Sequence, residues 1–121
     1  MGTSVGYVAG WARRLKADEE RRRRRAREAA IAARKCARIL YEKYGVHKVY
    51  LVGSLAEPEA FHDRSDIDFV VEGLPPRLYF KALAELWREL SAGLELDLIP
   101  FEDADPELCR RVLEKGVMLH G

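Results

Sequence analysis

The chain has 121 residues, of which 48% are hydrophobic and 34% are charged, so it suits one domain with a core and is too short for two. No apolar run approaches the roughly 20 residues that a membrane helix needs, and the two cysteines lack metal-ligand spacing. These features exclude collagen-like, low-complexity, disulfide-stapled and membrane-spanning proteins. We therefore expect a cytoplasmic protein with no membrane partner.

The nearly balanced charge, 21 basic against 20 acidic residues, hides an uneven distribution along the chain. Residues 13–38 carry 12 Lys or Arg against 4 Asp or Glu, a net charge of +8, whereas residues 39–121 carry 9 against 16, a net charge of −7. Because opposite charges attract, this distribution makes association into a homo-oligomer one of the expected arrangements.

A long helix is expected over residues 7–44, because this segment is rich in Ala, Arg, Glu and Leu and has no proline or glycine between Gly10 and Gly45. Its second half carries apolar residues at helical spacing, which predicts a face that packs on the rest of the chain. These residues are Ala26, Ala30, Ala33, Ala37, Leu40 and Tyr44. We therefore expect a helical arm at 1–45 and a domain at 46–121.

Five consecutive arginines, Arg21 to Arg25, would cover the whole circumference of this helix at about 100° per residue, so they cannot lie in an apolar core. Three interpretations are open. The run can be a solvated helix with ion pairs to neighbouring acids, a surface that docks on an acidic partner or another copy, or a nucleic-acid site. Nucleic acid is the least favoured because no aromatic residue interleaves the arginines. Trp11, near the start of the helix, is a candidate anchor on a neighbouring molecule.

Beyond Gly45 the sequence predicts strands alternating with helices. Segments rich in β-branched and aromatic residues and bounded by Gly or Pro predict buried strands at 46–52, 66–72 and 94–101. Helical patterns follow at 77–92, with Leu86 and Trp87 on one side, and at 105–115. The expected fold class is α/β (α+β), with a small mixed β-sheet flanked by helices and a long N-terminal helix.

Three aspartates carry the predicted chemistry. Asp66 and Asp68 stand two apart in a strand, so both carboxylates leave the same face, and Asp97 joins them if its strand runs alongside at about 4.8 Å. Like charges about 4 Å apart repel by roughly 4 kcal/mol at an effective dielectric constant near 20, so the cluster needs bound cations or raised pKa values. Such oxygen ligands favour Mg²⁺ or Mn²⁺, with substrate phosphates completing the coordination. The alternative is an inert, solvated acidic edge.

Gly53 and Ser54 end the first strand and suggest the phosphate side of the site. Glycine lets the backbone approach a ligand, and Ser54 can cap a short following helix while its hydroxyl and nearby N–H groups face an anion. A Gly-Ser turn alone is weak evidence. Followed by Asp-x-Asp after eleven residues and by a third acidic strand, it becomes specific.

These motifs together resemble the signature of the minimal nucleotidyltransferases of the DNA polymerase β-like superfamily, and the similarity extends over residues 46–121. The resemblance implies a nucleotidyltransferase fold, ATP as substrate and two Mg²⁺ ions. It assigns the triphosphate to Gly53 and Ser54, and the metals to Asp66, Asp68 and Asp97. Asp97 would bind the ion nearest the nucleophile and help to take its proton.

The same resemblance implies an antitoxin that transfers AMP from ATP to a hydroxyl, expected to be a tyrosine, of a partner HEPN-domain toxin. Two alternatives stay open: transfer to a small molecule, and a non-catalytic module that blocks its partner with the basic arm. The chain departs from the family after Ser54, where residues 55–58 are Leu-Ala-Glu-Pro and many members have basic residues. Less positive charge would then face the triphosphate.

Overall fold

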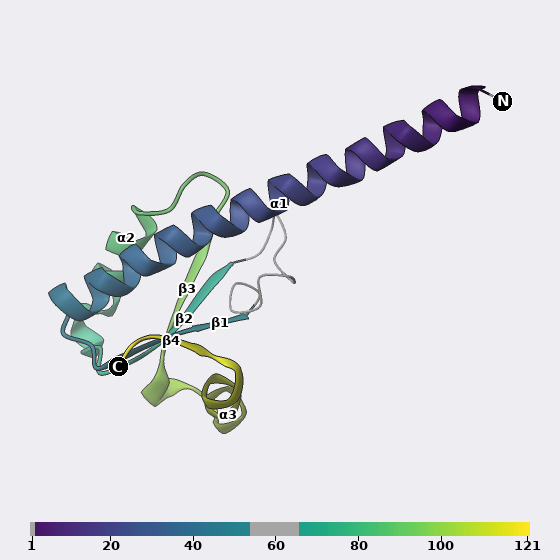
Figure 1. The fold of residues 1–121 in the computed structure, drawn as a ribbon. Helices are drawn as coiled ribbons and strands as arrows, with labels where there is room; N and C mark the ends of the chain where they lie inside the picture. Colours follow the sequence, from purple (N-terminus) through teal and green to yellow (C-terminus); the bar gives the residue numbers. More distant parts are fainter. Residues whose placement is uncertain (1, 54–65) are drawn as a thin grey trace.

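The computed structural model describes residues 2–53 and 66–121, with side chains from Ala9 onward. A four-stranded sheet has α1 and α2 on one face and α3 on the other (Figure 1). In chain order the elements are α1 (Gly2–Lys43), β1 (Lys48–Val52), β2 (Ile67–Glu72), α2 (Tyr79–Trp87), β3 (Leu96–Pro100), α3 (Pro106–Lys115) and β4 (Val117–His120). Short 3₁₀ turns at Pro76–Leu78 and Phe101–Asp103 precede α2 and α3.

The sheet has the strand order β3-β2-β1-β4. Strand β1 pairs antiparallel with both β2 and β4, whereas β2 and β3 are parallel and are connected through α2. A parallel pair needs such a crossover, because a tight hairpin cannot return the chain to the same end of the sheet. The expected mixed sheet flanked by helices is confirmed.

The second half of α1 belongs to the core of the domain. Its buried residues are Ala29, Ala32, Ala33, Cys36, Ala37, Leu40 and Tyr44. The expected stripe is therefore correct from residue 33 onward, whereas Ala26 and Ala30 are only partly buried. The small side chains let the helix approach the sheet closely, so the core crosses the boundary that the sequence suggested at residue 45.

The first half of α1, residues 2–24, projects beyond the sheet and is called the arm (Figure 1). From Trp11 to Arg24 every residue is exposed. Contact with the body begins at Arg25, whose Nη1 donates to the Ala92 carbonyl at 3.1 Å. Within the arm Arg21 pairs with Asp18, and Arg23 pairs with Glu19 at 2.6 Å. These ion pairs agree with the solvated-helix interpretation of the arginine run.

Helix α2 is shorter than the predicted range of 77–92. It ends at Trp87, because the following residues turn to start β3 parallel to β2. Its buried residues are Ala82 and Leu86, whereas Trp87, predicted on the same side of the helix as Leu86, is 42% exposed. The apolar residues 117–119 form most of β4, which has four residues and is too short to be predicted from an alternation of apolar and polar residues.

Both cysteines are free thiols. Burial, followed by the nearby Glu89 carboxylate, raises the pKa of the Cys36 thiol to about 12. Cys36 is fully buried and therefore packs as a small apolar residue. Among the described residues, none of the helices combines the length and the apolar character that crossing a bilayer requires.

Candidate functional site

The strand register places two of the predicted aspartates side by side. Asp68 is the second residue of β2 and lies opposite Asp97 in the parallel pairing with β3. On its other side Asp68 lies opposite Val52, the last residue of β1, so Gly53 follows immediately beside it. The sheet thus brings three predicted site residues from three strands to one end.

The shifted pKa of Asp68 shows that the third aspartate, Asp66, is also close to it. Asp66 directly precedes β2 and is exposed, as is Asp97, whereas Asp68 is half-buried. Burial raises the pKa of Asp68 to about 6, and the negative charges of Asp97 and Asp66 add to the shift. Repulsion among these three carboxylates is the effect expected for a site built to hold cations.

The carboxylates alone do not form a complete metal site. Across residues 2–53 and 66–121, no three His, Cys, Asp or Glu side chains are arranged so that they could hold one ion. Mg²⁺ commonly takes only one or two protein carboxylates and fills its other positions with water and substrate phosphates. The carboxylates of Asp66, Asp68 and Asp97 suit that mode of binding and do not form a closed protein cage.

Gly53 is required for two independent reasons. Its φ of +79° lies in the left-handed region, which side chains other than glycine rarely adopt. A Cβ atom at this position would also lie 2.6 Å from the Asp68 Oδ2 atom. Ser54, and the departure from the family at 55–58, lie outside the described residues.

Replacing Gly53 with alanine is expected to lower nucleotidyl transfer by about 100-fold, because the added methyl group displaces the Asp68 carboxylate. The matched control is Gly45→Ala. Gly45 has a similar φ of +69° but no atom within 4 Å of the added Cβ, so this variant bears only the backbone strain. Transfer rates and melting temperatures of the two variants separate the contact from the strain. Equal losses of activity in both would contradict the role of Gly53 beside Asp68.

Tyr79 supports the site and was not predicted from the sequence. Its hydroxyl donates to the Leu98 carbonyl at 2.7 Å, which ties α2 to β3 at the residue after Asp97. Burial raises the pKa of this hydroxyl, and the Asp97 carboxylate raises it further. No motif marks Tyr79, because its role depends on the crossover that places α2 against β3.

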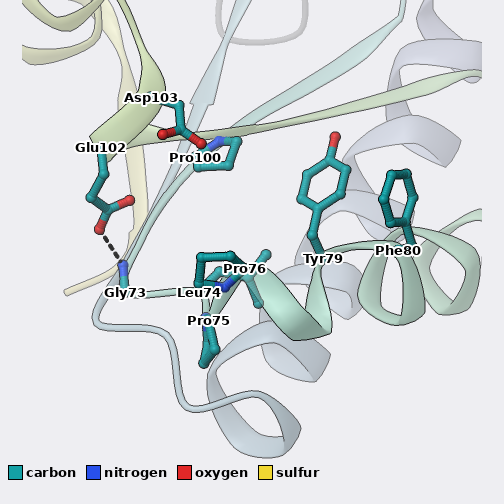
Figure 2. A pocket seen from close by; sticks show the side chains of 9 residues that line it. All are labelled: Gly73, Leu74, Pro75, Pro76, Tyr79, Phe80, Pro100, Glu102 and Asp103. Atoms are coloured by element: carbon teal, nitrogen blue, oxygen red, sulfur yellow. Dashed lines mark hydrogen bonds between the residues drawn. The ribbon is translucent and has the colours of Figure 1, made fainter.

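A pocket of about 690 Å³ lies at the other end of the sheet (Figure 2). Its lining comes from residues 73–76, Tyr79, Phe80, Pro100, Glu102 and Asp103. Glu102 accepts a hydrogen bond from the Gly73 N–H at 2.8 Å. The pocket lies beyond the C-terminal end of β2, five residue steps of about 3.3 Å each from Asp68 to Gly73. The pocket is therefore a different cavity from the carboxylate site, although Tyr79, which lines it, reaches the Leu98 carbonyl next to Asp97.

Residues 33–119 match the sequence profile of the nucleotidyltransferase domain. The chain belongs to the nucleotidyltransferase domain family. No curated protein matches it. The family expected from the Gly-Ser and Asp-x-Asp signature is thereby confirmed, and the match begins beyond the arm.

Solved structures share the fold of this nucleotidyltransferase. A toxin-antitoxin crystal structure with AMP-PNP is 25% identical, with a TM-score of 0.61, over 73% of each chain. A crystal structure of the toxin-antitoxin MntA-HepT is 23% identical, with a TM-score of 0.57, over 76% of this chain and 72% of the other. These similarities confirm the nucleotidyltransferase fold.

Proposed function

We propose that this nucleotidyltransferase is a Mg²⁺-dependent antitoxin that transfers AMP from ATP to a tyrosine hydroxyl of a HEPN-domain toxin. The observation that carries the proposal is the register of Asp68 with Asp97, beside Gly53. Two similarities support it: the solved neighbours are toxin-antitoxin structures, and one of them contains the ATP analogue AMP-PNP.

The metal assignment follows from the donor chemistry. Asp66, Asp68 and Asp97 would hold two Mg²⁺ ions together with phosphate oxygens. Burial, followed by the charges of Asp97 and Asp66, raises the pKa of Asp68, and the repulsion among the carboxylates favours cations at this place. When bound, such ions neutralise phosphate charge and stabilise the attacking and leaving oxygens of an in-line displacement.

The chain's own residues position the reactants. Without a side chain, Gly53 lets the backbone approach the triphosphate, and Ser54 would donate to it. The exposed Asp97 carboxylate would accept the proton of the attacking hydroxyl. The hydroxyl oxygen then forms a bond to the α-phosphorus as the bond to the β-phosphate breaks, and pyrophosphate leaves with the electron pair.

The acceptor is proposed to be a protein because of the exposure of the site. Asp66 and Asp97 are exposed, so the carboxylate site is open to a large partner. A side chain presented on the surface of a partner can reach such an open site.

The test combines labelled ATP, Mg²⁺, the purified HEPN partner and either the native chain or the double variant Asp66→Ala, Asp68→Ala. The variant is expected to lose at least about 1,000-fold in AMP transfer, since both metal-binding positions of β2 are removed. The matched control is Glu107→Ala, Glu114→Ala, which removes two exposed carboxylates from α3.

The rival functions give other results. A non-catalytic blocking module would leave the Asp66→Ala, Asp68→Ala variant able to neutralise the toxin. An enzyme for a small acceptor would turn over ATP and that acceptor with no other protein present. Label on a tyrosine of the partner, absent with the double variant and present with the α3 control, supports the proposed function.

A further inference from the structure

The arm presents an exposed aromatic and cationic group that the proposed chemistry does not use. Trp11 and Leu15 are each 53% exposed and lie one turn apart, on the same side of the helix. The guanidinium of Arg14 lies 5.9 Å from the centre of the Trp11 ring. Tryptophan and arginine are the residue types that most often dominate the energy of protein interfaces.

The arm cannot fold back on its own body. Helix α1 runs without a break from Gly2 to Lys43, and its contact with the body starts at Arg25. At 1.5 Å per residue the arm extends about 35 Å from that contact. The pocket lies at the C-terminal ends of β2 and β3, whereas Arg25 contacts the body at Ala92, before β3 begins, so the arm leaves the body from the other end of that strand. Among the described residues the body therefore offers Trp11 no partner, and a second molecule can supply one.

The pocket has the complementary chemistry. Prolines and the edge-to-face pair of Tyr79 and Phe80, with ring centres 5.2 Å apart, form its apolar surface, and Phe80 is 78% exposed. Its charged lining residues are Glu102 and Asp103, with no lysine or arginine among the lining residues. Such a surface suits an aromatic ring accompanied by a cation.

We propose that the pocket of one copy of this chain binds Trp11 and Arg14 of a second copy, in a reciprocal dimer. Charge favours this occupant, since the arm carries seven basic against three acidic residues and residues 39–121 carry a net charge of −7. Antiparallel α1 helices related by a twofold axis bring each arm to the pocket of the other copy. Each chain then contributes an arm and a pocket to the dimer.

The test uses sedimentation equilibrium of the full chain and of two variants. The arm variant is Trp11→Ala, Arg14→Glu, and the pocket variant is Phe80→Ala, Asp103→Lys. Each variant alone is expected to dimerise at least about 30-fold more weakly than the native chain, because each loses both reciprocal contacts. All the substituted residues are exposed, so circular dichroism should show unchanged folding.

Mixing the two variants gives the decisive result. An intact arm then meets an intact pocket once per pair, so the mixture is expected to recover dimerisation that neither variant has alone. The native dimer should weaken by roughly tenfold between low salt and 0.5 M NaCl, because the charges are screened.

Three results would overturn the proposal. One is a native chain that stays monomeric up to about 100 µM. Another is a pocket variant that dimerises normally, which would indicate contact between the arms. The third is an arm that binds only an RNA duplex or the HEPN partner, with no self-association.

Discussion

Asp68→Asn is expected to raise the free energy of unfolding of the metal-free protein at pH 7 by about 1–2 kcal/mol, although it removes a residue of the proposed site. The pKa of Asp68 is raised to about 6 in the fold. Folding therefore opposes ionisation of this carboxylate, and its destabilising effect grows as the pH rises from about 4 to about 6. Asparagine does not ionise, so the difference in the free energy of unfolding between the variant and the native chain should vanish near pH 4, where Asp68 is neutral in the fold.

Denaturant unfolding between pH 4 and pH 8, in the presence of a chelator, measures this effect. The matched control is Glu114→Gln, which neutralises an exposed carboxylate on α3. In a separate assay with Mg²⁺ and no chelator, Asp68→Asn should lose the proposed AMP transfer. A variant less stable than the native chain at pH 7 would contradict the assigned repulsion among Asp66, Asp68 and Asp97.

Leu40→Ala is expected to lower the free energy of unfolding by about 2–4 kcal/mol, because it opens a cavity in the core. Leu40 is fully buried between α1 and the sheet, beyond the expected domain boundary. For a domain of this size the melting temperature should fall by about 10–20 °C. Thermal unfolding followed by circular dichroism gives both quantities.

Leu15→Ala provides the control within the same helix. Leu15 is 53% exposed, so the same chemical change should alter the free energy of unfolding by less than about 0.5 kcal/mol. The comparison is made in dilute protein, where copies are separate. Similar effects of the two substitutions would mean that residues 29–44 do not share the core with the strands.

The strands and the carboxylate site could be predicted because local patterns determine them. Apolar runs bounded by glycine or proline located β1, β2 and β3 to within two residues. Alternation predicted Asp66 and Asp68 on one face of a strand, whereas β2 begins at Ile67, one residue after Asp66. The pairing of Asp97 with Asp68 was conditional on neighbouring strands, and the parallel register of β2 and β3 confirms that condition.

Features that depend on distant packing could not be read from the sequence. Helical periodicity did not determine which alanines of α1 face the sheet, since Ala29 and Ala30 fit a helix equally well. The end of α2 is set by the turn into β3, and the exposure of Trp87 follows from that geometry. Tyr79 supports the site through a hydrogen bond to the carbonyl of Leu98, nineteen residues later, which no local pattern indicates.

The strand order has a consequence for how the chain acquires its structure. Strand β4 lies beside β1, although most of the sheet's sequence separates the two. During synthesis on the ribosome, the edge of β1 that pairs with β4 stays unpaired until β4 has been made. An unpaired edge of this kind is a place where nascent chains can associate wrongly. A chain truncated before Val117 would lack β4 and would keep this edge of β1 unpaired after folding.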